Sequence, residues 1–406
     1  MTLASHLHPG DRIFVAGSSN EPTGLLSALR ADVLPERLHF VQFPIAGYNG
    51  EDFTAWHPTF THGTFFMTPA LRKADRHRLQ FLPMQMRHVY DYLARDIDVV
   101  LTQAARDRNG VLRFGPNVDF LQAALGGARA LLLEVNDAIV APAGGLAVDE
   151  SRVTAMVSTD RPPYYAPAAV IDDVSRAIGE RIASLVQDGD CLQTGIGAIP
   201  AAILDALSSH NDLGLHGGLI DDGGMRLIAR GVVTGRCKAI DTGHHVTGMA
   251  LGSAALYDWL ADQPDVIFRG ANYTHEVSII RQLDNFVSVN SAVEIDLFGQ
   301  VNAEFAGGRQ ISGTGGSIDF MRGARASRGG RSIVAMPATA RAGAVSRIVN
   351  RVELVTAART DVDIVVTEYG VARLRETSSR ERAMALVELA APEFREALRE
   401  QAHAIS

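Results

Sequence analysis

The sequence has few of the features that mark secreted, membrane-spanning or metal-binding proteins. It contains two cysteines, Cys191 and Cys237, whose spacing predicts neither a disulfide framework nor a zinc knuckle. No apolar run reaches the roughly 20 residues that span a bilayer. Residues 1–11 also lack the basic and apolar regions of a signal peptide. We therefore expect a cytoplasmic protein that does not insert in a membrane and binds no metal ion.

Lysine is scarce as well, and acidic residues outnumber basic ones. The formal net charge is −8, and Lys73 and Lys238 are the only lysines. Because nucleic acids and anionic membranes attract an excess of cations, neither is expected as a partner. With only these two amines available, catalysis through a Schiff base is also not expected.

Several catalytic signatures are missing. The sequence has no GxSxG motif, which argues against the nucleophile elbow of serine hydrolases. His244, His245 and His275 do not have the HExxH or HxH spacing that brings imidazoles to one metal ion. We interpret these histidines as ordinary buried or exposed side chains.

The sequence does contain an internal repeat. The first copy is an apolar strand at 13–16, a turn at 17–22 and a helical pattern that ends near Leu29. The second copy repeats this order from Cys191 to Leu207. Because strands alternate with helices and 406 residues exceed what one core normally organises, we predict an α/β fold. Two tandem domains are expected, each with a mostly parallel sheet flanked by helices.

A proline-rich segment suggests where the first domain ends. Residues 159–167 contain three prolines, which neither continue a helix nor donate to a β-ladder. We place the boundary there, with domains at 1–165 and 166–406. In the second domain, residues 286–297 are predicted to form one strand, and the chain from Ser379 onward is predicted to be helical.

Two glycine-rich turns lie in the second half. Gly195-Ile196-Gly197 follows the second strand of the repeat, and the other turn contains Gly313, Gly315 and Gly316. Such turns bring backbone N–H groups close to a ligand, as a phosphate cradle or an oxyanion hole, although a tight turn alone also favours glycine. The first turn resembles a dinucleotide fingerprint too, with Asp221 and Asp222 about twenty residues further on. Pro200 stands where that fingerprint has its third glycine, which argues against a dinucleotide site. An NAD-dependent enzyme is therefore kept only as an alternative.

Arginine is concentrated in one segment. Residues 321–359 contain eight arginines and one acid, Glu353. Because guanidinium groups bind phosphate oxygens well, this segment is a candidate for holding a polyphosphate. A solvated surface, or one that faces another subunit, is the alternative interpretation.

Four segments carry a resemblance to a known family. Residues 193–200 (QTGIGAIP), 288–302 (SVNSAVEIDLFGQVN), 312–324 (SGTGGSIDFMRGA) and 361–372 (DVDIVVTEYGVA) closely resemble the acetyl-CoA hydrolase/transferase family. The similarity covers nearly the whole chain. It implies that both domains have the class I CoA-transferase fold, with acyl-CoA bound mainly by the second domain. It also implies that the protein forms homo-oligomers.

The resemblance further implies a reaction. A glutamate attacks the thioester, forms an acyl-glutamyl anhydride and is then captured by coenzyme A, without a tightly bound cofactor. Amides of the two glycine turns, together with Asn290, stabilise the oxyanion that forms when the thioester carbonyl becomes tetrahedral. Arg322 and Arg347 are the candidates for binding the phosphates of CoA.

The chain departs from the family pattern at the nucleophile. Family members have His-Ser-Glu-Met-Ile-Ser-Asp-Gly, whereas residues 216–223 read His-Gly-Gly-Leu-Ile-Asp-Asp-Gly, so Gly218 stands at the glutamate position. Glu51, Asp221 and Asp222 are the candidate replacements, and Glu294 is interpreted as structural. If none of them acts, room left by Gly218 beside two oxyanion sites would allow direct attack by water or by a bulkier acceptor.

We therefore expect an acyl-CoA:carboxylate CoA-transferase whose partners are acyl-CoA and a carboxylate or another acyl acceptor. Hydrolysis of acyl-CoA, or another acyl-thioester transfer, is the runner-up. A catalytically inactive binding subunit and the NAD-dependent enzyme are more distant alternatives. The acyl group and the acceptor are not identified by the sequence.

Overall fold

The computed structural model describes residues 2–167 and 169–405, which form two compact units. Unit 1 comprises Met1–Pro167 with the later segments Val246–Thr274 and Ile311–Gly315. Unit 2 comprises Ala168–His245, His275–Gln310 and Gly316–Ser406. The first crossing between the units lies close to the predicted boundary at 165/166. Two segments from the second half nevertheless pack with unit 1, an arrangement that the division into 1–165 and 166–406 did not contain.

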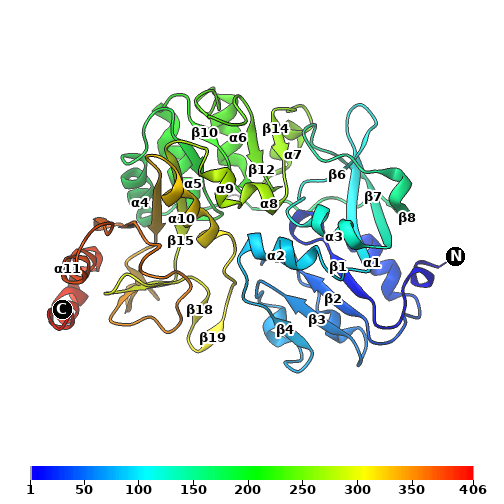
Figure 1. The fold of residues 1–406 in the computed structure, drawn as a ribbon, viewed down its shortest axis with the longest axis horizontal. Coiled ribbons are helices and arrows are strands. Elements are labelled where there is room, and N and C mark those ends of the chain that lie inside the picture. The colour runs from blue at the N-terminus through cyan, green and yellow to red at the C-terminus, as the bar shows by residue number, and fades with distance from the viewer. Residues whose placement is uncertain (1, 168, 406) are drawn as a thin grey trace. The chain divides into compact units, whose positions relative to one another are not determined.

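Unit 1 is built around one large sheet. Its strands run in the order β4-β3-β2-β1-β5-β7-β8, all parallel, with β6 antiparallel to β5 (Figure 1). The strands are β1 (Arg12–Val15), β2 (His39–Gln42), β3 (Thr61–Thr64), β4 (Leu79–Phe81), β5 (Val99–Arg106), β6 (Leu112–Phe114), β7 (Ala130–Val140) and β8 (Val153–Thr159). The helices include α1 (Thr23–Arg30), α2 (Met86–Leu93), α3 (Leu121–Gly127), α7 (Ala254–Leu260) and α8 (Ala271–Thr274).

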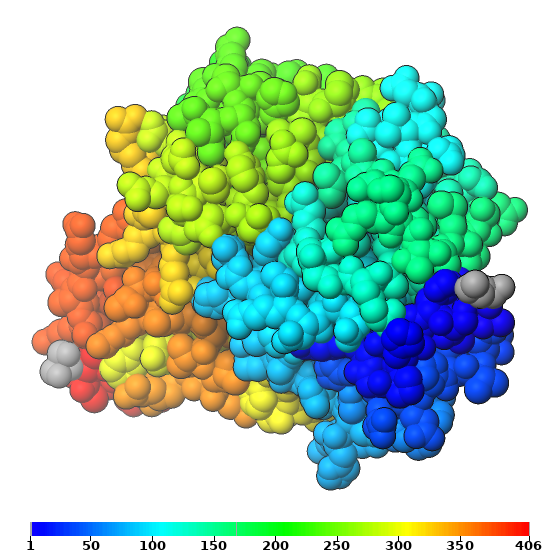
Figure 2. All heavy atoms as spheres, turned by 45° about the vertical axis from the view of Figure 1, so that its right-hand side comes forward, coloured from blue at the N-terminus to red at the C-terminus, as the bar shows by residue number. Residues whose placement is uncertain are grey.

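Helix α1 covers one face of this sheet. Its apolar residues Leu25, Leu26 and Leu29 are buried in the same cluster as Ile13 of β1 and Val99 of β5. This three- and four-residue spacing is the apolar stripe of an amphipathic helix. The N-terminal segment joins the same unit, because Arg129 pairs with the Asp11 carboxylate and donates to the His6 carbonyl. Figure 2 shows the dark blue start of the chain beside the blue-green part of the same unit.

Unit 2 has a smaller sheet of six strands. The order is β10-β9-β15-β20-β24-β25, parallel except for the last strand, which is antiparallel. The strands are β9 (Cys191–Gln193), β10 (Gly214–Leu215), β15 (Phe286–Ser291), β20 (Arg331–Ala335), β24 (Ile364–Thr367) and β25 (Gly370–Arg373). The helices are α4 (Asp173–Ala183), α5 (Ala198–Ala206), α6 (Asp222–Ala229), α9 (Val277–Ile280), α10 (Ser317–Ala326), α11 (Ser379–Leu389) and α12 (Pro392–His403).

Two apolar clusters of unit 2 contain side chains from the same strands. One joins Ile178 of α4 and Ile203 of α5 to Val287 of β15 and Ile333 of β20. The other joins helices α10, α11 and α12 to neighbouring side chains of β20 and β24, which include Val334. Because successive side chains of a strand point to opposite faces, the sheet is covered by helices on both sides. The parallel strands β9, β10, β15, β20 and β24 are accordingly mostly buried, as expected of a doubly wound sheet, whereas the antiparallel edge strand β25 is largely exposed.

The repeat in the sequence reappears in the topology. In unit 1 the first strand, β1, lies between β2 and β5, followed outward by β7 and β8. In unit 2 the corresponding strand, β9, lies between β10 and β15, followed outward by β20 and β24. The predicted α/β class with mostly parallel sheets is thus confirmed.

One local prediction was wrong, and another is confirmed except for a short break. Residues 286–297 do not form one strand: β15 ends at Ser291, and β16 (Glu294–Asp296) belongs to another sheet, between β17 (Val301–Asn302) and β23 (Ile348–Val349). The alternating apolar pattern therefore predicted the extended backbone but not the change of sheet. The helical C-terminus is interrupted before Pro392, which begins α12 because proline suits the first turn of a helix. Within the described ranges, no helix combines the length and apolarity that a membrane crossing needs.

Candidate functional site

The first glycine turn connects β9 to α5. Gly197 has φ of +116°, a backbone conformation that glycine adopts without strain, and it is the residue immediately before α5. A Cβ atom on Gly195 or Gly197 would meet nothing within 4 Å, and the Ile196 side chain is 53% exposed. The first N–H groups of a helix have no partner inside the helix and carry partial positive charge. The turn therefore offers an accessible surface of backbone amides.

A pair of amide side chains lies beside this turn. Gln193 is the last residue of β9, and its Oε1 accepts a hydrogen bond from Nδ2 of Asn290 in β15 at 3.3 Å. Gly217 packs against Gln193 as well, because a Cβ atom at 217 would lie 3.2 Å from Cγ of Gln193. Parallel pairing of β9 with β15 brings these residues together. The predicted site residue Asn290 is thus held near the Gly195 turn through Gln193.

The second glycine turn lies where the chain passes from unit 1 to unit 2. Gly313 and Gly315 belong to unit 1: a Cβ atom on Gly313 would lie 2.2 Å from the Phe65 carbonyl oxygen, and the Gly315 carbonyl accepts from the Met86 amide. Gly316 belongs to unit 2 and immediately precedes α10. Both glycine turns therefore end at a helix N-terminus in unit 2.

The structure corrects the expectation of room beside Gly218. A Cβ atom on Gly218 would lie 2.8 Å from Cε1 and 3.1 Å from Nε2 of His275. His275 lies between α8 and α9 and is 1% exposed. The imidazole therefore occupies the space in which a side chain at position 218 would begin. Residue spacing did not indicate this role for His275, because the contact joins segments far apart in the sequence.

Asp221 and Asp222, two candidate replacements for the glutamate, lie at the start of α6. The Asp221 carboxylate caps this helix by accepting a hydrogen bond from the Gly224 amide at 2.9 Å. Burial raises the pKa of Asp221, and the Gly224 amide opposes that shift. Asp222 is the first residue of the helix, where a negative charge is favourable. Both acids thus stabilise the N-terminus of α6.

Glu51, the other candidate, lines a pocket within unit 1. The pocket has a volume of about 320 Å³ and is also lined by Glu21, Arg30 and Trp56. Glu51 is partly exposed, and Oε1 of its carboxylate lies 3.4 Å from Nη1 of Arg30. A second carboxylate, that of Glu21, thus faces the same pocket.

Glu21 is an unusual acid that the sequence analysis did not select. Burial raises its pKa to about 7, even though hydrogen bonds with Gln42 and Asn49 oppose the shift, and the Glu51 charge raises it further. Nε2 of Gln42 donates to Oε1 of Glu21 at 2.8 Å. The sequence could have indicated Glu21 through its position in the turn after β1, because that turn is the first copy of the turn that contains Gly195.

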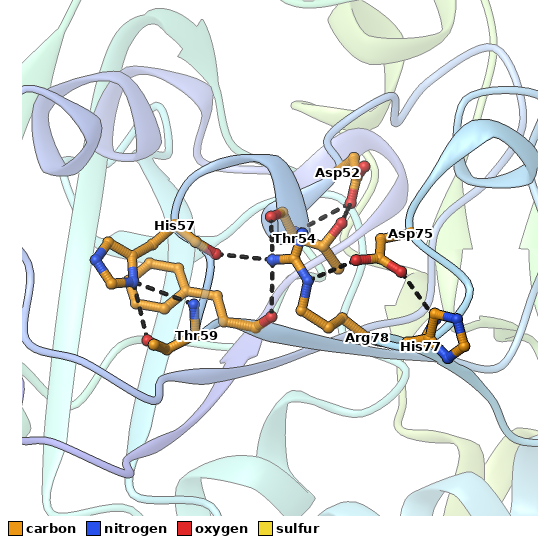
Figure 3. Close-up of polar contacts among 8 residues, drawn as sticks. Asp52, Thr54, His57, Thr59, Asp75, His77 and Arg78 are labelled. Carbon is orange, nitrogen blue, oxygen red and sulfur yellow. Dashed lines mark hydrogen bonds and ion pairs between the residues drawn. The ribbon is translucent and has the colours of Figure 1, made fainter.

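The segment after Glu51 is held by a single guanidinium group. Arg78 donates to the carbonyl oxygens of Thr54 at 2.6 Å and His57 at 2.8 Å, and to the Asp75 carboxylate at 2.8 Å (Figure 3). Asp52 begins this segment by accepting from the Thr54 amide at 3.0 Å. These bonds give the loop a defined backbone next to the pocket that contains Glu51.

Most arginines of the 321–359 segment already have protein partners. Arg322, 49% exposed, pairs with Asp361 at 3.2 Å. Burial lowers the pKa of Arg347, whose Nη1 donates to the Ala292 carbonyl. Arg328 and Arg331 pair with acids, and Arg325 donates to the Thr360 carbonyl. The segment is therefore less available to a polyphosphate than its composition indicates, and Arg322 remains the more exposed of the two candidates.

Comparison with known proteins identifies the family. The sequence profile of the acetyl-CoA hydrolase/transferase C-terminal domain matches residues 252–402. The chain is 36% identical over 406 residues to the 4-hydroxybutyrate coenzyme A transferase of Clostridium kluyveri, covering 97% of this chain and 94% of that protein. The chain belongs to the acetyl-CoA hydrolase/transferase family. The predicted resemblance is confirmed.

Solved structures of similar proteins agree with this assignment. RipA from Yersinia pestis has a TM-score of 0.92 and 33% identity, over 99% of this chain and 96% of RipA. The 4-hydroxybutyrate CoA-transferase from Porphyromonas gingivalis has a TM-score of 0.81 and 32% identity, over 97% of this chain and 94% of that chain. The family's fold thus extends over nearly the whole chain, including the unit that carries Glu21 and Glu51.

Proposed function

We propose that this protein is an acyl-CoA:carboxylate CoA-transferase. The observation that carries the proposal is the pair of glycine turns at the N-termini of α5 and α10, in a chain that matches a named CoA-transferase over nearly its full length. Backbone amides aimed at a developing oxyanion are the largest single contribution that such a site makes to acyl transfer. Coenzyme A is a substrate in this proposal.

The amides of the Gly195 turn and of the Gly316 turn would bind the thioester carbonyl oxygen as it becomes negative. Asn290, fixed by Gln193, would supply a side-chain amide beside the first turn. Arg322 and Arg347 are the proposed contacts to CoA phosphates. These groups stabilise charge and position the substrate, and none of them has to accept a proton.

The attacking group cannot be a carboxylate at position 218, since glycine occupies it. We propose Glu51 as the nucleophile, with Asp221 and Asp222 as the less favoured candidates because both serve the start of α6. Attack by its carboxylate oxygen on the thioester carbon breaks the C–S bond, releases the CoA thiolate and forms a mixed anhydride. The thiolate then attacks the glutamyl carbonyl, which releases the donor acyl group as its carboxylate and leaves a glutamyl-CoA thioester. The acceptor carboxylate attacks that thioester and releases the thiolate again, and the thiolate attacks the acceptor's carbonyl in the new anhydride, giving the product acyl-CoA and free Glu51. Glu21, whose pKa is raised to about 7, adjoins Glu51 in the pocket and would modulate its charge.

The test is transfer of CoA between defined substrates. Purified protein is incubated with acetate and, separately, butyryl-, 4-hydroxybutyryl- or succinyl-CoA, and acetyl-CoA is measured by chromatography. We expect acetyl-CoA formation that depends on acetate, and a label on Glu51 after trapping with hydroxylamine. Absence of transfer from a broad panel of acyl-CoA donors and carboxylates would refute the assignment, and turnover without label would exclude Glu51 as the nucleophile.

Hydrolysis of acyl-CoA is the second candidate. It is favoured by the missing carboxylate at position 218, since water is then a competing attacker. A thiol-reactive dye measures CoA release without any acceptor. We expect slow release without acetate; release as fast as the transfer rate would make the protein a hydrolase.

The proposal also includes a cytoplasmic location and assembly into homo-oligomers. Light scattering after size exclusion measures the assembly directly.

Stabilisation by CoA against thermal unfolding, with no enhancement of NADH fluorescence, would exclude the nicotinamide alternative.

A further inference from the structure

His275 fills a gap between two glycines that are distant in the sequence. A Cβ atom on Gly316 would lie 2.4 Å from both Cδ2 and Nε2 of the imidazole, and one on Gly218 would lie 2.8 Å from Cε1. Carbon atoms in favourable contact are about 3.5 to 4.0 Å apart. Neither glycine therefore has space for a side chain while the imidazole is in place.

The imidazole also packs against an aromatic side chain and is buried. Its ring packs against Phe320 of α10, with ring centroids 4.4 Å apart, and Phe320 in turn lies 6.4 Å from the Phe286 ring. The residue is 1% exposed. Because interiors are close-packed, a ring enclosed in this way moves only if its neighbours move.

These contacts place Nε2 of His275 between two backbone segments of the proposed site. Nε2 is the ring atom that comes near both glycines. Gly316 precedes α10 and ends the second glycine turn, and Gly218 precedes β11 (Leu219–Ile220), in the segment after β10. The distance between these two backbone segments is therefore set by the width of an imidazole.

We propose that His275 is a positioning residue of the acyl-transfer site, which sets the spacing between Gly218 and the Gly316 turn and occupies the space of a side chain at position 218. The effect of His275 on catalysis rests on the proposed function, whereas its steric role does not. The inference goes beyond that function because it assigns a role to a residue that contacts the site only through backbone. A consequence is that the attacking carboxylate or acceptor must come from a position other than 218.

Burial supports a neutral role for this side chain. Desolvation lowers the pKa of His275 to about 3, so the imidazole carries no charge in the neutral pH range. A neutral imidazole keeps one donor and one acceptor nitrogen without adding a cation beside the oxyanion amides. Stabilisation of the oxyanion is therefore left to the backbone amides and Asn290.

The steric part is tested by a double-mutant cycle on thermal stability. Gly218→Ala is expected to lower the melting temperature, because its methyl group collides with the imidazole. In the His275→Ala background the same substitution should leave the melting temperature unchanged or raise it. Gly126→Ala, at a position with open space and ordinary backbone, is the matched control. An equal decrease in both backgrounds would overturn the inference. This cycle does not depend on any enzymatic activity.

The catalytic part is tested with two variants that refill the cavity. His275→Leu replaces the ring with an apolar group, and His275→Gln retains polar atoms. With CoA transfer as the assay, we expect kcat to fall roughly 10²-fold for the Leu variant with KM nearly unchanged, since a misplacement of about 1 Å is enough for such a loss. The Gln variant should recover part of kcat. Wild-type kcat in the Leu variant would overturn the positioning role.

Failure of the proposed function can be distinguished from failure of the inference about His275. If the wild-type protein neither transfers nor hydrolyses any acyl-CoA, the proposed function fails, and the stability cycle alone then decides whether His275 and Gly218 are sterically coupled. If the wild-type protein is active and the cycle shows no coupling, the inference fails and the proposed function stands.

Discussion

The turns that follow the first strand of each unit occupy the same place in the topology but are built differently. In unit 1 the turn after β1 is filled by polar side chains: the Ser18 amide donates to Asn49 at 2.6 Å, and Glu21 bonds to Gln42. In unit 2 the turn after β9 has no side chain at Gly195 or Gly197, with open space around both. One copy of the repeat is thus occupied by its own side chains, and the other leaves its amides accessible.

The strand order and the chemistry of the turns are therefore separable. The sheet of each unit needs buried strands and covering helices, which both copies provide. The turn at the carboxyl end of the strand is not needed for that core, so its residues are available for other purposes. Unit 1 places carboxylates there, and unit 2 places backbone amides there.

The largest expected effect concerns the filled turn of unit 1. The pKa of Glu21 is raised to about 7 from an ordinary value of 4.5, so the folded state binds its proton more tightly than the unfolded state. The stability that this proton contributes is present below pH 4.5 and is lost as the pH rises through 7. Glu21→Gln should therefore increase the free energy of unfolding at pH 8 by up to about 3 kcal/mol, with no gain near pH 4.

Urea unfolding at several pH values measures this difference. Glu36→Gln, which removes an exposed carboxylate from the same unit, is the control. If the two variants behave alike, the turn of unit 1 does not hold a destabilised carboxylate, and the contrast with unit 2 loses its energetic basis.

The second effect concerns the open turn of unit 2. Gly195→Ala adds a methyl group where nothing lies within 4 Å, so the fold should be unaffected. Loss of access to the amides should lower kcat/KM for CoA transfer by roughly 10²-fold. Circular dichroism checks the fold, and Gly126→Ala is the control. Activity within a factor of about two of the wild type would mean that the open turn does not meet the substrate.

The third effect distinguishes a partly buried contact from an exposed one. Arg78→Ala removes the donor for carbonyl oxygens of Thr54 and His57 (Figure 3) and should lower the free energy of unfolding by about 2 kcal/mol. Arg328→Ala removes an exposed ion pair in unit 2 and should leave the melting temperature unchanged. Equal effects would indicate that the loop beside Glu51 is not held by Arg78.

The smallest effect concerns substrate binding in unit 2. Arg322→Ala should raise KM for acyl-CoA about tenfold, equivalent to about 1.4 kcal/mol, with kcat unchanged. An acyl-pantetheine substrate, which lacks the nucleotide phosphates, should be insensitive to the substitution. Arg328→Ala again serves as the control. An unchanged KM for acyl-CoA would remove Arg322 from the phosphate contacts.

Much of the architecture was accessible from residue order. The apolar strands of the repeat, the tight turns that follow them and the helical C-terminal region were predicted at the right places. The family resemblance was predicted from four motifs and is confirmed by the comparisons. Local patterns suffice here because strand burial and helix periodicity are properties of neighbouring residues.

The predictions failed where distant segments meet. The break after Ser291 depends on pairing of β16 with β17 and β23, which the alternating pattern of that segment does not encode. The arginines of 321–359 looked free in the sequence, yet Arg331 pairs with Asp190 and Arg328 with Asp284. Partners of charged side chains are chosen in space, and composition does not reveal them.

Residue order was enough to predict the α/β class, the repeat, the family and the absence of a carboxylate at position 218. The folded chain was needed to show that His275 fills the space beside Gly218, that Glu21 shares a pocket with Glu51, and that Asp221 caps a helix. Sequence periodicity reports on neighbours within one turn or one strand. Burial, steric exclusion and the pKa of a carboxyl depend instead on atoms brought close by the whole fold.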